Sequence, residues 1–308
     1  MQFQRLPWPP THDSTSQRLR GFYPKTISDR NKLRDFLAEL DSFKDRPNST
    51  RLSVRAIVHT PLILSIGRFG VEAVLPLRRS PEYSLVYLAY NAPGRLTHLK
   101  KLKTQAEELA GLQADFRGRA IAELKRQAIG YELATHPALD IATAEQIRDL
   151  FAVRFLACPE PMSVDNIMNM SSTSVIVTAK NAATGELAGV FMGDLSFADI
   201  EGQALRMVEF NHVLAKSGAP HQALIPLMAF LVIKETTWSS PIIFAEAHAD
   251  VLALQAACLT VGMQYCGTMR ASFLMVHLNE KSGMQIFKNA HVWHLPEARR
   301  IEILGELG

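Results

Sequence analysis

The middle of the chain alternates short apolar stretches with polar turns, in an order that predicts a meander followed by a helix. Three stretches are typical of β-strands: Ser174–Lys180, Glu186–Met192 and Leu205–Phe210. The polar segment Asn181–Gly185 joins the first two and is typical of a hairpin turn, because Gly185 tolerates a positive φ. After the third strand, the small-residue loop 215–219 leads into an apolar helix expected over Gln222–Thr236.

Further elements on both sides of the meander extend this pattern. Thr143–Gln146 has the spacing of a capping box and predicts a helix that continues to Pro159. After the apolar helix we expect a strand at Ile242–Ala247, a helix at Ala249–Val261 and two strands around 268–278 and 285–295. The order α-β-β-β-α-β-α-β-β predicts the α+β class, with one mixed sheet flanked by helices.

The first 140 residues predict a smaller α+β unit. Residues 1–26 lack periodicity and are expected to form an arm, and Leu33–Leu40 has helical spacing. Strands are expected at 52–59, 62–68, 71–77 and 84–90, a long helix at 96–131, and a linker at 135–140. The predicted organisation is an N-terminal arm at 1–26, an accessory or substrate domain at 27–140 and the main domain at 141–308.

Composition excludes several classes of function. The 308 residues carry a net charge of +3, which does not indicate a nucleic-acid partner, and basic clusters such as Arg78-Arg79 are interpreted as solvated surface. Three cysteines without a CxxC spacing favour a reduced, cytoplasmic location. The N-terminus has no apolar h-region, and the longest apolar run is about half of the ~20 residues that span a membrane, so neither export nor a membrane partner is expected. Metal motifs such as HExxH are absent from the sequence, and no metal is expected.

The second half resembles a known family in the order of its elements and in three segments near its end. These segments are Glu246-Ala-His-Ala-Asp250, Ala256-Ala-Cys-Leu-Thr-Val-Gly-Met-Gln-Tyr-Cys-Gly-Thr268 and Asn289-Ala-His-Val-Trp-His294. Over residues 142–296 the chain resembles the GNAT superfamily of acyl-CoA-dependent N-acyltransferases, most of all its β-lysine N-acetyltransferase type. The resemblance implies transfer of an acyl group, expected to be acetyl, from coenzyme A to the amino group of a small molecule or amino acid.

The resemblance also implies where the acyl-CoA co-substrate binds. Backbone groups at 213–215 would pair with the pantetheine arm, and N–H groups of the following loop would hold the pyrophosphate at a helix N-terminus. The loop departs from the family pattern Arg/Gln-x-x-Gly-x-Gly/Ala, and Pro220 removes one N–H group. The residues expected to contact acyl-CoA are Val213, Leu214, Ala215, Lys216, Gly218, Ala219, Gln222 and Ala223.

Acyl transfer to an amine needs a base for the amine and a proton for the leaving thiolate. The family often carries a glutamate on the third strand of the meander, which makes Glu209 the first candidate for the base, and His212 is the second. A solvent-facing Glu209 and a structural His212 are the alternative interpretations. Cys258 occupies the position where many members carry a proton-donating tyrosine, and Tyr265 is the alternative donor.

The acceptor site is less well defined by the sequence. Glu246 and His248 alternate with alanines at the carboxyl end of the next strand and are candidates for binding the acceptor amine. Acceptor identity is expected to lie in the loops 158–173 and 195–204 and in the first 140 residues, which also offer a surface for a homodimer. Two other functions stay open: transfer from the thioester of an acyl carrier protein docked at Arg78-Arg79, and a GNAT-shaped binding module without catalysis.

Overall fold

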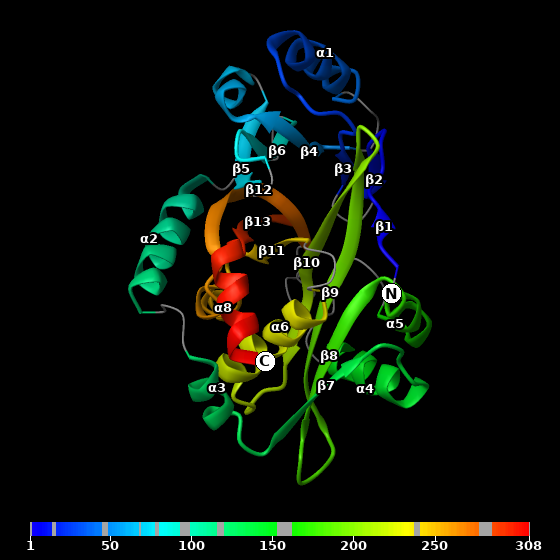
Figure 1. The fold of residues 1–308 in the computed structure, drawn as a ribbon, viewed down its shortest axis with the longest axis vertical. Coiled ribbons are helices and arrows are strands. Elements are labelled where there is room, and N and C mark those ends of the chain that lie inside the picture. The colour runs from blue at the N-terminus through cyan, green and yellow to red at the C-terminus, as the bar shows by residue number, and fades with distance from the viewer. Residues whose placement is uncertain are drawn as a thin grey trace.

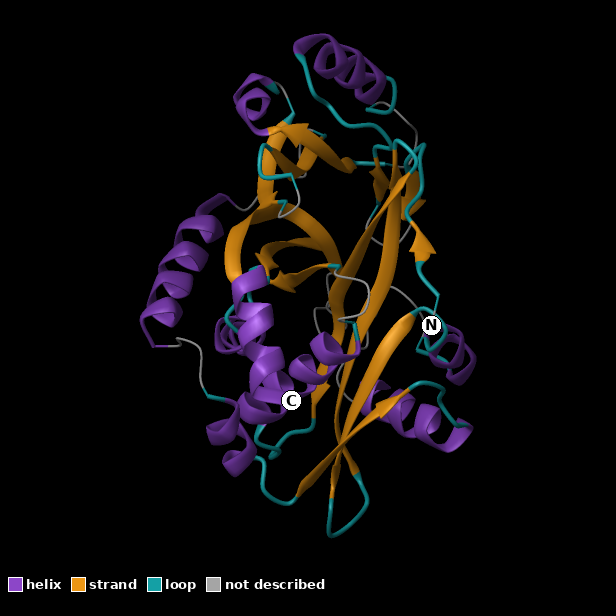
Figure 2. Ribbon diagram, in the orientation of Figure 1, coloured by secondary structure: helices purple, strands orange, loops and turns teal. Residues whose placement is uncertain are grey.

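Helices and one large mixed sheet make up the structure, which confirms the predicted α+β class (Figure 1; Figure 2). The computed structural model describes residues 2–13, 17–44, 49–67, 69–77, 80–92, 99–115, 120–152, 162–236, 241–276 and 285–307. In these ranges the strands follow the order β2-β3-β4-β6-β5-β12-β13-β11-β10-β9-β8-β7, and β1 pairs with β9.

The predicted meander is present, and two of its strands are longer than expected. β8 spans Ser174–Asn181, β9 spans Leu187–Ile200 and β10 spans Gln203–Ala215. The predicted turn between β8 and β9 is closed by a hydrogen bond from Gly185 N to Asn181 O (2.8 Å). Residues 195–204, expected to be a specificity loop, form the turn end of the β9–β10 hairpin instead, because their apolar side chains Leu195, Ala198 and Ile200 are buried against the rest of the fold.

β10 and β11 run parallel and then separate. α6 (His221–Glu235) connects them with nearly the predicted bounds, and β11 spans Ile242–His248. The two strands pair only from Met207 opposite Ile242 to Phe210 opposite Ala245. Beyond that point β10 stays paired with β9 and β11 with β13, so the sheet opens between them. The second half ends with α7 (Leu252–Val261), β12 (Gln264–Val276), β13 (Gln285–His294) and α8 (Glu297–Leu307).

Residues 99–170 add several helices and a strand at the edge of the meander. Their elements are α2 (Leu99–Asp115), α3 (Ile121–Gln127), β7 (Tyr131–His136), α4 (Ile141–Ala152) and α5 (Val164–Met170). β7 pairs with β8 from Tyr131 to His136, so the linker expected at 135–140 begins inside a strand. α4 begins before the expected capping box, because Asp140 Oδ1 accepts the backbone N–H of Thr143 (2.7 Å).

The N-terminal residues contribute strands to the sheet instead of forming the expected arm. β1 (Gln4–Arg5) pairs with β9, while β2 (Thr11–Asp13) and β3 (Arg18–Phe22) form a hairpin beside β4 (Arg51–His59). α1 (Arg30–Asp41), β5 (Gly70–Pro76) and β6 (Tyr83–Asn91) complete this part. The strand expected at 62–68 is replaced by a 3-10 helix over Thr60–Ser65, because Pro61 in its first turn lacks the N–H that a strand ladder needs.

The helices and the N-terminal strands cover opposite faces of β10 and β11. Val208 and Phe210 belong to the core formed with α6. Met207, one position earlier, belongs to a second core that includes Phe22 of β3 and Phe244 of β11. Side chains of this size each contribute roughly 1.5–3 kcal/mol when fully buried. The N-terminal strands are therefore held over the non-helical face of β10 by apolar packing.

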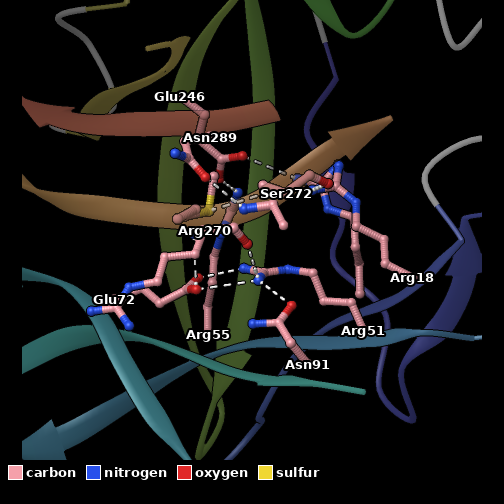
Figure 3. Close-up of polar contacts among 12 residues, drawn as sticks. Arg18, Arg51, Arg55, Glu72, Asn91, Glu246, Arg270, Ser272 and Asn289 are labelled. Atoms are coloured by element: carbon pink, nitrogen blue, oxygen red, sulfur yellow. Dashed lines mark hydrogen bonds and ion pairs between the residues drawn. The ribbon is translucent and has the colours of Figure 1, made fainter. Parts of the chain in front are cut away.

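A buried polar cluster joins the N-terminal strands to β12 (Figure 3). Arg51 is only 1% exposed and pairs with Glu72. Its Nη1 donates to Asn91 Oδ1 (2.8 Å) and to the carbonyl oxygen of Arg270 (2.6 Å). The backbone N–H of Arg270 donates in turn to Glu72 Oε1 (3.0 Å). Because a buried charge requires its partner, this cluster specifies how β4, β5 and β6 meet β12.

Gly267 lies where β12 meets β5, and its substitution is expected to destabilise this junction. It is paired with Ala73 at a φ of +151°, and a Cβ there would lie 2.0 Å from the carbonyl oxygen of Glu72. We expect Gly267→Ala to lower the free energy of unfolding by about 2–4 kcal/mol, measured by urea denaturation. Gly305→Ala in α8 is the control: its Cβ meets no atom within 4 Å, and alanine favours a helix by up to ~1 kcal/mol. Equal stability of the two variants would show that, in solution, the backbone at Gly267 moves away from the carbonyl oxygen of Glu72 and admits a Cβ.

Candidate active site

A cavity of about 620 Å³ lies between the N-terminal strands and the non-helical face of β9, β10 and β11. Arg20 and Arg55 line it from β3 and β4, and Glu209 and Glu246 line it from β10 and β11. His212 lines it as well, so three of the residues proposed from the sequence lie around one cavity. Charged side chains that converge on a concave site are a feature of binding and catalysis.

Strand alternation and a bulge determine which β10 side chains reach the cavity. Val208 and Phe210 point to the helices, so Glu209 between them points to the opposite face. The register between β10 and β9 shifts between Phe210 and Val213, and both Asn211 and His212 line the cavity there.

Arg55 of β4 brings two carboxylates of the cavity together. Its Nη2 pairs with Glu246 and lies 3.5 Å from Glu209 Oε2. The guanidinium also stacks on the rings of Tyr87 and Phe244, with each ring centroid 4.9 Å from Cζ. Arg55 is 8% exposed, so both ion pairs are shielded from water and the aromatic rings add a cation–π attraction.

The shared guanidinium leaves the two carboxylates with different proton affinities. Burial and the neighbouring Glu246 carboxylate raise the pKa of Glu209 to about 7, although Arg55 and Arg20 act in the opposite direction. Burial also opposes the ionisation of Glu246, but the cations Arg55, Arg20 and Arg18 outweigh it and lower the pKa of Glu246. Glu246 is therefore a constant counter-ion, whereas Glu209 exchanges its proton near neutral pH, as a general base does.

Asp194 of β9 lies directly opposite Glu209 and adds a third carboxylate to this wall. Ser174 Oγ donates to its Oδ1 (2.8 Å), and Asn211 Nδ2 donates to its Oδ2 (2.7 Å). The register of the meander brings these four residues together, since Ser174 is paired with Asp194 as well. Hydrogen bonds to both oxygens orient the Asp194 carboxylate beside Glu209, where a positively charged group would be attracted by both.

The loop between β10 and α6 presents unused backbone donors at a helix N-terminus. The N–H groups of Ser217, Gly218 and Gln222 donate to no acceptor among the residues described. Gly218 has a φ of +86°, and no atom lies within 4 Å of the position that its Cβ would take, so the space beside the loop is open. Free N–H groups in this position, at the positive end of a helix dipole, favour an anion such as a phosphate.

The other donors of this loop are used within the protein. Pro220 has no N–H, and the N–H of His221 donates to Ala219 O (2.7 Å). The N–H of Ala219 donates to Lys216 O (3.1 Å), and the Lys216 amino group pairs with Glu186. Lys216 is therefore engaged in an ion pair, and the unused donors of this loop are backbone N–H groups.

The strand that precedes the loop has one open edge. Val213, Leu214 and Ala215 are paired with Phe191, Val190 and Gly189 of β9. Their opposite edge faces the opening toward β11, where no described strand pairs with it. Ala223, in the first turn of α6, is buried in the helix-side core, and its N–H donates to Pro220 O (2.9 Å), so neither its side chain nor its N–H is available to a ligand.

Three residues considered in the sequence do not line the cavity. Tyr265 is paired with Trp293 on the helix-facing side of the sheet, and its hydroxyl bonds to Thr268 Oγ1 (2.6 Å). His248 lies two residues after Glu246 at the end of β11, and its burial there lowers the pKa of its imidazole. Cys258 lies in the helix-side core, where burial raises the pKa of its thiol to about 12 and makes it a poor proton donor.

Sequence reasoning missed the cationic half of the cavity and Asp194. Arg55 carried a usable signal, because it lies in a predicted strand directly between Val54 and the apolar run Ala56-Ile57-Val58, where a charge needs a buried counter-ion. Arg20 carried none, since it lies in a polar segment that was expected to form an arm.

Within the described ranges, no group of three or more His, Cys, Asp or Glu side chains is arranged to hold a metal ion. The helices described are all too short or too polar to cross a membrane. Arg78-Arg79, expected as a docking surface for a carrier protein, and Cys158 lie outside the described residues.

Comparison with known proteins finds similarity to solved structures over about half of the chain. No protein-family model and no curated protein matches it. It is similar over 54% of its length to NAA60 from Arabidopsis thaliana in complex with acetyl-CoA, at 9% identity, 97% coverage of that chain and a TM-score of 0.44. It is also similar over 55% of its length to a GNAT superfamily phosphinothricin acetyltransferase from Sinorhizobium meliloti in complex with AcCoA, at 15% identity, 90% coverage of that chain and a TM-score of 0.41.

Proposed function

We propose that this protein is an N-acyltransferase that moves an acetyl group from acetyl-CoA to the amino group of a small molecule. The observation that carries the proposal is the dual role of β10. It presents Glu209, with a pKa of about 7, to a charged cavity, and it then diverges from β11 toward a helix N-terminus with unused N–H donors. The order of elements from α4 to β13 agrees with what the resemblance to the GNAT superfamily implies.

The residues of the opening fit an acyl-CoA donor. The free N–H groups of Ser217, Gly218 and Gln222 would hold its pyrophosphate. The open edge of β10 at Val213–Ala215 would pair with the amide groups of the pantetheine arm, as an added strand does. Bound there, the donor supplies a thioester whose carbonyl carbon is reactive toward an amine.

Glu209 would remove a proton from the acceptor ammonium group, and the freed amine nitrogen would form a C–N bond with the thioester carbonyl carbon. The C–S bond breaks, the sulfur leaves with the bonding electron pair, and a second proton from the nitrogen neutralises the thiolate. Glu209 then releases its proton to solvent, so each turnover yields one amide, one thiol and one proton. Asp194 stabilises the ammonium before transfer, since its carboxylate lies beside Glu209.

Calorimetric titration with acetyl-CoA tests the donor site. We expect micromolar affinity in the unmodified protein and a Kd at least about 100-fold higher in Gly218→Glu, because a carboxylate would occupy the space of an anion. Gly202→Glu is the matched control: Gly202 has a φ of +82°, open space around its Cβ, and a place in the turn at the opposite end of β10. Its affinity for acetyl-CoA should be unchanged.

The same titration distinguishes the alternatives. Binding of an acyl carrier protein thioester without binding of any CoA ester would reassign the donor. If neither donor binds, the protein is a GNAT-shaped binding module that does not catalyse acyl transfer. Equal weakening by Gly218→Glu and Gly202→Glu would mean that the loop between β10 and α6 does not hold the donor.

A further inference from the structure

We infer that the acceptor is an amine that carries a carboxylate, such as a free amino acid, with its carboxylate bound by Arg20 and its ammonium group by Glu209 and Asp194. This inference rests on the proposed function and specifies its second substrate. The structural basis is a separation of charge across one cavity: anions line it from β9 and β10, and cations line it from the N-terminal strands.

Two of the buried cations of this wall are already committed to protein partners. Arg55 pairs with Glu246 and Glu209 between two aromatic rings. Arg18 is 3% exposed, and its Nη1 donates to Ser272 Oγ (2.8 Å) (Figure 3). Neither guanidinium is free to turn toward a ligand without leaving a buried partner unpaired.

Arg20 is different, because its side chain is 40% exposed and its contact with Glu246 is a long 3.8 Å. It lies between Thr11 of β2 and Ser53 of β4 in directly paired positions, so the three side chains share the cavity face. The hydroxyls of Thr11 and Ser53 have no hydrogen-bond partner within the described structure. A guanidinium with a hydroxyl on each side is a receptor for the two oxygens of a carboxylate.

The charge around Arg20 favours a carboxylate over a phosphate. The Glu246 carboxylate beside Arg20 is nearly fully buried and has a lowered pKa, so it stays negative and reduces the net positive charge available to a ligand. A singly charged carboxylate suits this residual charge better than a doubly charged phosphate group. The opposite wall supplies carboxylates at Glu209 and Asp194 for the ammonium end of the same molecule.

Acetyl transfer to matched amines tests the inference in the unmodified protein. The assay measures the rate of thiol release from acetyl-CoA. Each of the twenty amino acids is compared with its carboxamide and with its decarboxylated amine. The smallest amino acids are also compared with an amine of similar size that carries a phosphate in place of the carboxylate. We expect at least one amino acid to exceed its carboxamide in kcat/KM by about 10- to 100-fold, the range of a charge-assisted contact. Arg20→Gln should remove this preference chiefly through KM, and Arg20→Lys should keep part of it.

Arg34→Gln is the control, because Arg34 is an exposed arginine of α1 paired only with its neighbour Asp35 among the contacts described. It should leave the preference intact. Equal rates for amino acids and carboxamides, or a preference for the phosphate, would overturn the inference while acetyl transfer itself stands. Acetyl-CoA binding without transfer to any amino acid would overturn it as well. Failure to bind acetyl-CoA would instead defeat the proposed function.

Discussion

Replacing Glu209 by glutamine is expected to lower kcat/KM for acetyl transfer by about 10²- to 10⁴-fold, the usual contribution of a general base. Glutamine has nearly the same volume and keeps a hydrogen-bonding group beside Arg55, so the cavity should persist. Only the ability to accept the ammonium proton is lost. Acetyl-CoA affinity, which we propose the loop at Ser217–Gly218 sets, should be unchanged.

The pH profile separates this role from a structural one. With a pKa of about 7, Glu209 is mostly protonated below neutral pH, so kcat/KM should rise as the pH increases through 7 and then level off. Glu209→Gln should lack this rise. His212→Gln is the comparison, because His212 lines the same cavity and is the second candidate for the base. If the rise survives in Glu209→Gln and disappears in His212→Gln, His212 is the base.

Stability gives a second measurement that needs no acceptor. The pKa of Glu209 is about 7 in the folded protein and near its ordinary 4.5 in the unfolded chain, so folding takes up a proton between these values. The contribution of Glu209 to the free energy of unfolding therefore decreases as the pH rises from 4.5 to 7. Glu209→Gln should be less sensitive to pH over this window, as followed by urea denaturation at several pH values. If the unmodified protein and Glu209→Gln show the same pH dependence of stability, the Glu209 carboxylate is exposed to solvent rather than buried.

Replacing Arg55 by alanine is expected to cost about 3–5 kcal/mol of stability, because it leaves the buried Glu246 carboxylate without its main partner. In the protein that still folds, loss of this cation should raise the pKa of Glu209 further and move the rise in kcat/KM to higher pH. Urea denaturation and the pH–rate profile measure the two effects separately.

Arg55→Lys keeps the charge but not the planar guanidinium that stacks on Tyr87 and Phe244, so it should restore the pH profile more fully than the stability. Arg34→Ala, at an exposed ion pair, should change stability by less than about 1 kcal/mol. A pH profile of Arg55→Ala that matches the unmodified protein would show that Arg55 does not influence the base.

Local pattern was sufficient for the elements that are stabilised by their own backbone and neighbours. The meander and its Asn181–Gly185 turn follow from strand-forming residues and a glycine with positive φ. α6 follows from an uninterrupted apolar stretch and lies within one residue of its expected bounds. Alternation also placed Glu209 on the face opposite Val208 and Phe210. These features needed no knowledge of distant residues.

Elements whose partners are distant in sequence were not predicted. Residues 1–26 have no strand pattern, yet Gln4 is paired with Ser196 and Arg18 with Arg51. A short polar strand is stable only when another strand supplies its hydrogen bonds, and the chain gives no local sign of that partner. The long helix expected at 96–131 is described as two helices, Leu99–Asp115 and Ile121–Gln127. The strand Tyr131–His136 that follows them was not predicted, because it is a strand only through its pairing with β8.

The sequence alone determined that Glu209 lies on a strand, away from the helices, at the position where the family resemblance implies a base. Only the tertiary structure decided that it faces a cavity lined by charged side chains rather than open solvent. That outcome depends on Arg20 and Arg55, which the fold brings across the cavity from strands that precede Glu209 by at least half of the length of the chain. A pKa near 7 arises from burial and from charges acting through space, and neither is encoded in the residues adjacent to Glu209.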